Sequence, residues 1–181
     1  MLTIKIDDNI ELRQIQITDA SDIFETINTQ RAYLGKWLPF VEYTKTIHDS
    51  ELFINSIYSE PPEKQELVFV INFDKKFAGI IGFKDTDKIN KKTEIGYWLS
   101  EPFQKKGIIT ESLKKLMDYV FKKMDINRIQ IKCATGNIQS SKIPRKLNFV
   151  FEGIERDGEL LSDGEFTNLE VYSILRRNWN K

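Results

Sequence analysis

The chain has 181 residues and a mass of 21.2 kDa, which suits one domain, and its 40% hydrophobic residues can fill a substantial core. Its 27 basic residues balance 27 acidic ones, so no net field favours nucleic acid or an anionic membrane. One cysteine, no signal-like start and no apolar run of roughly 20 residues lead us to expect a single cytoplasmic domain over residues 1–181. Composition leaves the oligomeric state, including a homo-oligomer, open.

The first half of the chain predicts strands and capped helices in alternation. Residues 10–17 alternate between apolar and polar side chains, as a strand does, and residues 18–22 supply N-cap candidates for a helix. A second helix is expected from about Thr46 to Ser59, with an apolar face. Two β-rich segments around Asp74-Lys75 then predict an antiparallel hairpin over residues 66–73 and 76–84.

The second half begins with the stretch from Thr93 to Lys123, which reads as a strand, a turn and a long helix. Residues 128–134 predict another strand, and a short helix is expected near residues 141–147. The last two strands are expected to pair across a polar turn, over residues 149–156 and 166–175. The predicted order is therefore β-α-α-β-β-β-α-β-α-β-β.

The turn before the long helix is a candidate anion site. It contains Gln104-Lys105-Lys106-Gly107, where glycine allows close approach of the backbone and the lysines add positive charge. The first N–H groups of a helix have no partner within the helix, and its dipole favours an anion there. An ordinary strand-loop-helix would have the same pattern. The nucleotide motifs GxxxxGK[ST] and GxGxxG are both absent.

This segment resembles the Q/R-x-x-G-x-G/A turn of the GCN5-related N-acetyltransferases, or GNAT family, with Ile109 in place of the second small residue. The resemblance implies a mixed α/β fold: a strongly curved sheet of six to seven strands, helices on both faces, and a splay between two central parallel strands. It also implies acetyl-coenzyme A (acetyl-CoA) as the co-substrate. The implied cofactor-binding residues are Tyr97, Trp98, Leu99, Gln104, Lys105, Lys106, Gly107, Ile108, Ile109, Thr110, Asn137 and Ser140.

A second group of residues narrows the resemblance to one branch of the family. Residues 137–140, 146–149 and 152–153 are similar to the N-x-x-S…K-x-G-F…E-G signature of the RimJ/RimL branch, with Asn148 in place of the usual glycine. That branch acetylates the amino termini of ribosomal proteins. The resemblance therefore implies a protein amino terminus as the acceptor.

Acetyl transfer to an amine needs a base for the amine and an acid for the leaving thiolate. The resemblance supplies two candidate bases, Glu159 and Glu94, of which we favour Glu159. It supplies Ser140 as the candidate acid, and Tyr172 is a second candidate near the chain end. The tyrosine acid of another branch would fall on Pro144. Each candidate also has a structural interpretation: solvated glutamates, a helix cap for Ser140 and a half-buried strand aromatic for Tyr172.

The acceptor pocket is the least defined part of the prediction. In the resembling fold, the substrate side of the cleft is covered by the segment that contains Tyr33, Trp37, Phe40 and His48. These side chains could equally belong to the core or to the solvated surface. Cys133 is expected to be a small core residue, and one histidine with one cysteine cannot form a usual zinc site, so no metal is expected.

The leading hypothesis is an acetyl-CoA-dependent N-acetyltransferase that works by direct attack in a ternary complex on a protein amino terminus. One alternative keeps the enzyme and changes the acceptor to a small amine, namely a polyamine, an amino sugar or an amino acid. Another alternative is a non-catalytic acyl-CoA sensor that uses the cleft for binding alone.

Overall fold

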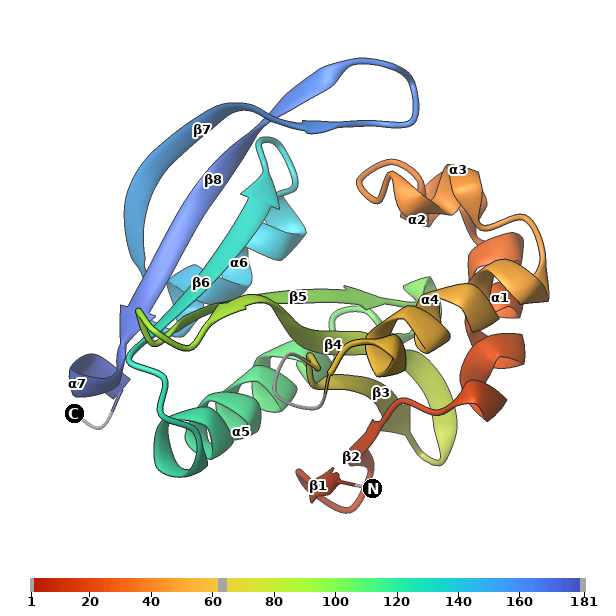
Figure 1. The fold of residues 1–181 in the computed structure, drawn as a ribbon. Helices are drawn as coiled ribbons and strands as arrows, with labels where there is room; N and C mark the ends of the chain where they lie inside the picture. The colour runs from red at the N-terminus through yellow and green to blue at the C-terminus, as the bar shows by residue number, and fades with distance from the viewer. Residues whose placement is uncertain (1, 62–64, 180–181) are drawn as a thin grey trace.

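The computed structural model describes residues 2–61 and 65–179. Eight strands form one curved sheet in the order β1-β2-β3-β4-β5-β6-β8-β7 (Figure 1). All neighbours are antiparallel except β5 and β6, which are parallel. The strands are β1 (Thr3–Lys5), β2 (Ile10–Gln14), β3 (Val68–Phe73), β4 (Lys76–Asp87), β5 (Lys92–Leu99), β6 (Arg128–Ala134), β7 (Val150–Leu160) and β8 (Phe166–Leu175).

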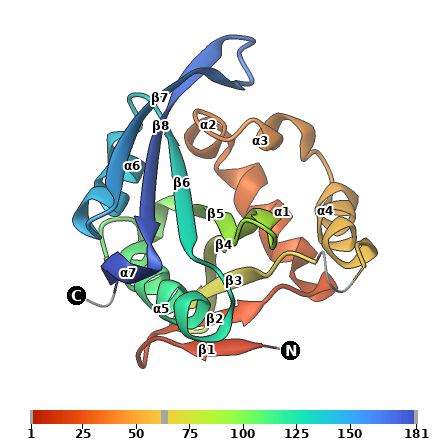
Figure 2. The same cartoon turned by 60° about the vertical axis from the view of Figure 1, so that its left-hand side comes forward.

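Helices cover both faces of the sheet, with α1 and α4 on one face and α5 and α6 on the other (Figure 2). Among the described residues, no helix is long and apolar enough to span a bilayer. The helices are α1 (Ala20–Thr29), α2 (Arg31–Leu34), α3 (Phe40–Tyr43), α4 (Ile47–Ser59), α5 (Ile108–Lys123), α6 (Ile138–Lys146) and α7 (Arg176–Trp179).

Local sequence signals explain where the main helices begin and which side they bury. Thr46 and Asp49 form a reciprocal capping box at the start of α4, so two orphan backbone donors are satisfied there. In α5 the apolar positions recur at helical spacing, and one face is fully buried against the sheet. The buried residues of that face include Leu113, Leu116, Met117 and Val120.

The sheet separates two apolar cores. The larger core joins α5 and α6 to the sheet face that carries Ile95, Ile129 and Tyr172. The smaller core joins α1 and α4 to the opposite face, where Val70 and Ile80 are buried. Because adjacent residues of a strand point to opposite faces, β5 contributes Tyr97 to the first side and Trp98 to the second.

The parallel pair in the middle of the sheet opens into a splay. The ladder between β5 and β6 consists of Lys92–Arg128, Thr93–Ile129 and Glu94–Gln130, and it ends there. Beyond Glu94, β5 stays paired with β4 as far as Leu99, and β6 stays paired with β8 to its end. The two central strands therefore diverge toward their carboxyl ends (Figure 1).

The fold class implied by the family resemblance is confirmed, including the central splay. The sheet has eight strands where six to seven were expected, because residues 3–5 pair with β2 and add an outer strand. The strand expected over residues 10–17 ends at Gln14, since the Asp19 carboxylate accepts a hydrogen bond from the Gln16 N–H and begins a 3₁₀ turn. The strand expected over residues 149–156 continues to Leu160.

Candidate active site

The turn before α5 has the geometry of an anion-binding helix terminus. Gly107 is the N-cap in the left-handed conformation, with φ of 77°, and no side chain caps the helix. The N–H groups of the first turn are therefore left for another partner. A Cβ on Gly107 would meet no atom within 4 Å, so this backbone faces open space.

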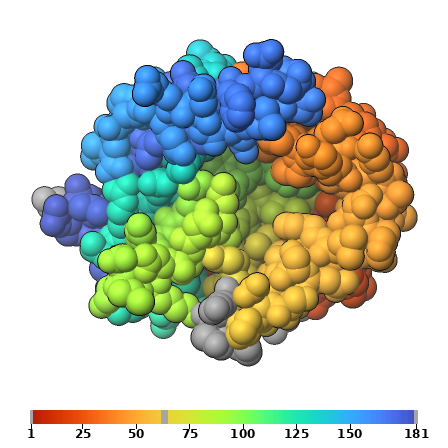
Figure 3. Space-filling view, turned by 45° about the horizontal axis from the view of Figure 1, so that its top comes forward, coloured from red at the N-terminus to blue at the C-terminus, as the bar shows by residue number. Residues whose placement is uncertain are grey.

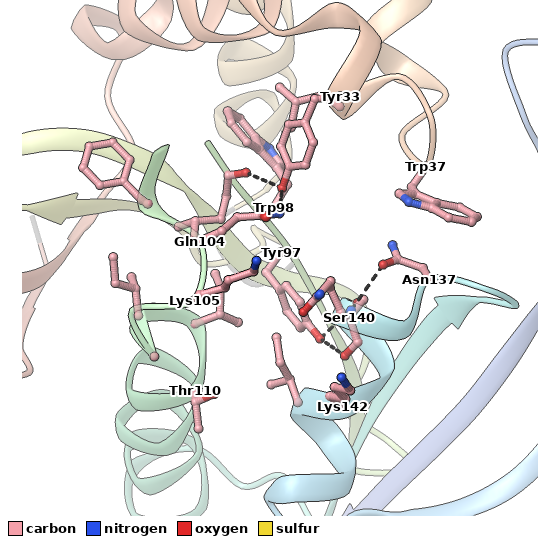
Figure 4. A pocket seen from close by; sticks show the side chains of 18 of the residues that line it. Tyr33, Trp37, Tyr97, Trp98, Gln104, Lys105, Thr110, Asn137, Ser140 and Lys142 are labelled. Atoms are coloured by element: carbon pink, nitrogen blue, oxygen red, sulfur yellow. Dashed lines mark hydrogen bonds between the residues drawn. The ribbon is translucent and has the colours of Figure 1, made fainter. Parts of the chain in front are cut away.

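A cavity of about 320 Å³ lies against this turn and extends to the splay (Figure 4). Its wall is formed by the end of β5, the start of α5, the first turns of α6 and the α2 segment. The residues that line it are Tyr33, Leu34, Trp37, Leu38, Tyr97, Trp98, Leu99, Phe103, Gln104, Lys105, Gly107, Ile108, Ile109, Thr110, Asn137, Gln139, Ser140, Lys142, Ile143 and Lys146.

Three exposed lysines, Lys105, Lys142 and Lys146, line this cavity. Within the described ranges, none of the three forms an ion pair, so their charge is available to an anion. Lys106 differs, because its ammonium lies 5.0 Å from the ring centre of Phe73 and 5.4 Å from that of Phe103. The side chain of Lys106 does not line the cavity.

A hydrogen-bonded cluster joins β5, β6 and α6 at the inner wall of the cavity. The Ser140 hydroxyl donates to the Tyr97 hydroxyl at 3.2 Å, and Tyr97 donates to the Ser140 carbonyl at 3.2 Å. Cys133 Sγ lies 3.3 Å from Ser140 Oγ, and burial raises the pKa of this thiol to about 11. The N-cap of α6 is Asn137, whose side chain accepts from the Ser140 N–H at 3.2 Å. Ser140 is therefore not the cap, and its hydroxyl faces the cavity wall.

The α2 segment closes the other side of the cavity. The Tyr33 hydroxyl donates to the Leu99 carbonyl at 3.3 Å and accepts a hydrogen bond from the Gln104 amide, and burial raises the pKa of Tyr33. The Trp37 ring packs over Gly136, where a Cβ would lie 3.6 Å from the ring. Tyr33 and Trp37, expected on the substrate side, thus belong to the wall of this cavity.

A hollow lies on the face of the sheet that α1 and α4 cover, with β4 and β5 as its floor (Figure 3). The β7–β8 arm and the α2–α3 segment meet at its rim, where the Ser162 hydroxyl donates to the Gly35 carbonyl at 3.1 Å. On the floor, buried Glu94 pairs with Lys84 at 2.9 Å and accepts from the Gln130 amide at 3.1 Å. Lys132 lies 3.9 Å from Glu94 and 2.8 Å from Glu155.

Glu159 is the exception among these carboxylates. It is half-buried on β7, and it forms no ion pair or side-chain hydrogen bond within residues 2–61 and 65–179. Burial raises its pKa, nearby Glu94 raises it further, and Lys84 and Lys132 oppose the shift. Glu159 is thus a carboxylate that can accept a proton, whereas both oxygens of Glu94 already contact other side chains, Oε1 the Lys84 ammonium and Oε2 the Gln130 amide.

Besides Lys106 and the two glutamates, three more of the expected site residues lie outside the cavity: Tyr172, His48 and Phe40. Tyr172 is fully buried. Its hydroxyl donates to the Glu170 carboxylate and accepts a hydrogen bond from Arg145 Nε at 2.7 Å. His48 is exposed on α4 and pairs with Glu51, while Phe40 is exposed on α3. Neither Phe40 nor His48 lines the cavity.

Neither the lysines of α6 nor the lysines of the hollow were predicted from the sequence. Lys142 and Lys146 are four residues apart on a helix, a spacing that places two side chains on one face and could have indicated a basic stripe. Lys84 and Lys132 come from strands that are neighbours of β5 on opposite sides, so their proximity to Glu94 depends on the sheet order.

Comparisons with known proteins agree with this architecture. The model of the acetyltransferase (GNAT) domain matches residues 9–150. The "Putative ribosomal N-acetyltransferase YdaF" of Bacillus subtilis (strain 168) is 34% identical over 180 residues, covering 99% of this chain and 98% of that protein. The ribosomal-protein-serine acetyltransferase of Escherichia coli (strain K12) is 25% identical over 173 residues, with 96% of each chain covered.

A solved structure shows the same fold with a ligand. RimL, a ribosomal alpha-N-protein acetyltransferase determined in complex with coenzyme A, superposes with a TM-score of 0.91 at 26% identity, covering 96% of this chain and 98% of RimL. The family match, the splayed sheet and the similarity to these relatives all indicate the same family. The chain therefore belongs to the GNAT acetyltransferase family, in its RimJ/RimL-type branch, and is an N-acetyltransferase.

Proposed function

We propose that this protein transfers the acetyl group of acetyl-CoA to the α-amino group at the N-terminus of a ribosomal protein. The amine attacks the thioester directly while both substrates are bound. We further propose that residues 1–181 act as one catalytic domain in the cytoplasm, where such an acceptor is made. A small amine as acceptor and a non-catalytic acyl-CoA sensor are the alternatives that the experiments below exclude or support.

The observation that carries the donor assignment is the cavity that joins the uncapped start of α5 to the splay. Coenzyme A has a diphosphate and a long pantetheine arm, so it needs an anion site that continues into a narrow slot. The first turn of α5 and the lysines of α6 provide the anion site. The slot is the gap between β5 and β6 beyond Glu94, where the two strands no longer pair with each other. RimL binds coenzyme A and has this fold, which supports the same use here.

On the acceptor side, we assign Glu159 as the base. It is half-buried and forms no ion pair with any residue that the structure describes, and its raised pKa improves its match to proton transfer near neutral pH. Glu94 forms an ion pair with Lys84 and accepts a hydrogen bond from Gln130, so both of its oxygens already have partners. We assign Glu94 to the structure of the hollow.

On the donor side, we assign Ser140 as the acid that protonates the leaving thiolate. Its hydroxyl lies on the wall of the cavity and hydrogen-bonds to Tyr97, which orients it. Tyr172 is excluded from this role by its full burial and its bonds to Arg145 and Glu170.

An N-terminal amine needs less help from a base than a lysine side chain does. With a pKa of about 7.7–8.0, roughly a tenth of α-amino groups are neutral at pH 7, whereas a lysine near 10.4 is neutral in under about one molecule in a thousand. One half-buried carboxylate, without a metal or a second base, can therefore activate an α-amine far more easily than a lysine side chain.

A panel of acceptors tests the proposal. The purified protein is incubated with acetyl-CoA and either short peptides with free N-termini, the same peptides with blocked N-termini, or small amines, and release of free thiol is measured. Thiol release with free peptides alone supports the proposal. Faster release with small amines supports the alternative acceptor. Coenzyme A that raises the melting temperature without thiol release from any acceptor supports the sensor.

A further inference from the structure

The Lys84–Glu94 pair lies at the fork where the central strands part. The two residues are cross-strand partners on β4 and β5, and Glu94 is the last residue of β5 that pairs with β6. The next residue on the same face is Gly96, and a Cβ there would lie 3.9 Å from Lys84 Cε. The Lys84 side chain thus extends across the start of the splay, on the side of the hollow.

Lys84 is also accessible to a ligand. Its side chain is 58% exposed, although it holds the buried Glu94 carboxylate at 2.9 Å. An ammonium has three N–H donors, and Glu94 is the one acceptor recorded for Lys84 among the described residues. Two of its donors are therefore left for an acceptor that binds beside it.

The second lysine of the hollow, Lys132, already lies beside carboxylates. Lys132 lies 3.9 Å from Glu94 and 2.8 Å from Glu155, and the exposed carboxylate of Asp85 adds negative charge near Lys132. Among the described residues, Glu159 forms no ion pair, so it is left for the reacting ammonium. A second group that lies beside Lys84 meets the exposed Lys84 ammonium, because the Glu94 carboxylate beneath it is only 7% exposed.

We propose that Lys84 is an acceptor-specificity residue that selects an amine with an anionic or neutral polar group beside it and rejects polyamines. This inference rests on the proposed function. It adds the chemical class of the residue that follows the N-terminal residue of the acceptor protein: Lys84 attracts an acidic side chain there and repels a basic one. A polyamine has a further ammonium within a few bonds of the reacting one. That distance is below the Debye length of about 8 Å, so salt does not remove the repulsion.

The test compares matched peptides. Three peptides begin with serine and differ at the second residue alone, which is glutamate, glutamine or lysine, and spermidine is the polyamine probe. For the natural protein, kcat/KM should fall from glutamate to glutamine to lysine, by about tenfold overall, and spermidine should be the poorest acceptor. The ratio between peptides is measured within each variant, so a change in overall activity does not affect it.

Variants separate Lys84 from its surroundings. Lys84→Met should reduce the glutamate-to-lysine ratio to within about twofold, and Lys84→Arg should keep it. Because Lys84→Met removes the cation nearest to buried Glu94, the double variant Lys84→Met/Glu94→Gln removes both charges and should show the same loss of preference. Lys122→Met removes an exposed, ion-paired lysine of α5 and should leave the ratio unchanged.

The outcomes distinguish this inference from the proposed function. If peptides are acetylated equally well whatever their second residue, or if Lys84→Met keeps the preference, Lys84 does not select the acceptor while N-terminal acetylation stands. If spermidine exceeds every peptide in kcat/KM, both proposals are overturned. A ratio that collapses in both methionine variants and survives in Lys84→Arg and Lys122→Met supports the inference.

Discussion

The two faces of the splay, to which we assign the donor and the acceptor, are built from different parts of the chain. On the donor face, the cavity is built around backbone N–H groups at the start of α5, with lysines at its edge. On the acceptor face, the floor of the hollow consists of charged side chains that neutralise one another in pairs, with Glu159 left over. The donor face therefore depends on backbone shape, and the acceptor face depends on the identity and charge of single residues.

Ile109 shows what this difference means for substitutions. It replaces the small residue of the family's turn, yet it is buried against the core and its backbone keeps its place in the first turn of α5. A side-chain change is tolerated where the backbone does the binding. On the acceptor face, a single charge change should alter the chemistry, and the predictions below compare the two faces in this way.

The largest effect is expected from the base. Glu159→Gln should lower kcat for an N-terminal peptide by about 100-fold or more, with little change in KM for acetyl-CoA. Because burial raises the pKa of Glu159, the activity of the natural protein should fall as the pH drops through a value above that of an ordinary glutamate, and the variant should lack this limb.

Glu155→Gln is the matched control for this prediction, because Glu155 is on the same strand and already pairs with Lys132. Its kcat should stay within about threefold of the natural protein. If Glu159→Gln keeps full turnover, the base is another group.

A change of backbone shape tests the donor face. Gly107→Ala should raise KM for acetyl-CoA roughly tenfold or more, because φ of 77° is strained for alanine and the new methyl group extends into the cavity. The strain alone should cost about 1 kcal/mol of folding free energy.

Gly164→Ala is the control for that strain. Gly164 has φ of 86° and open space around it, and it lies in the β7–β8 turn, away from the cavity. Thermal unfolding should show a similar loss of stability for the two variants, and steady-state kinetics should show a raised KM for Gly107→Ala alone. Equal KM values would mean that the turn does not contact the cofactor.

The lysines of α6 should have a smaller effect. Lys142→Met and Lys146→Met should each weaken coenzyme A binding about fivefold at low salt, and less as ionic strength rises, because exposed charges are screened. Calorimetric titration at two salt concentrations measures both quantities. Lys106→Met should bind almost as the natural protein does, since the Lys106 ammonium lies over Phe73 and Phe103.

The smallest effect concerns a carboxylate with a structural role. Arg128 and a Ser173 hydrogen bond lower the pKa of Glu152 from 4.5 to about 2. A lowered pKa means that the native state favours the charged form, so this stabilisation is present above pH 4.5 and is lost as the pH falls toward 2.

Glu152→Gln should therefore cost about 0.5 to 1 kcal/mol at pH 7, a value reduced by the partial exposure of the pair, and the difference from the natural protein should vanish near pH 2. Denaturant unfolding at several pH values measures it. Activity at pH 7 should be unchanged, in contrast to Glu159→Gln. A stability difference that persists at low pH would contradict the assignment.

Much of the donor face could be predicted from sequence. Glycine in a lysine-containing turn before an amphipathic helix defines a backbone site, and residues close in sequence are sufficient to build it. Asn137 and Ser140 were predicted from the resemblance to the N-x-x-S signature, whose residues are contiguous and form the N-cap and first turn of α6. Only the distinction between them, with Asn137 as the cap and Ser140 free to face the cavity, required the structure.

The sequence by itself determined the family, the order of the longer helices and strands, and the turn before α5, because these follow from local periodicity and from contiguous motifs. It did not predict β1 or the short helices α2, α3 and α7. Tertiary structure alone decided the partners of the carboxylates. The sequence does not show which of Glu94 and Glu159 has a partner. Lys84 and Lys132 reach Glu94 from neighbouring strands, and Glu159 forms no ion pair within the part of the chain that the structure describes. The reason is physical: the charge state of a carboxylate depends on distances across the sheet, which strand order and register set.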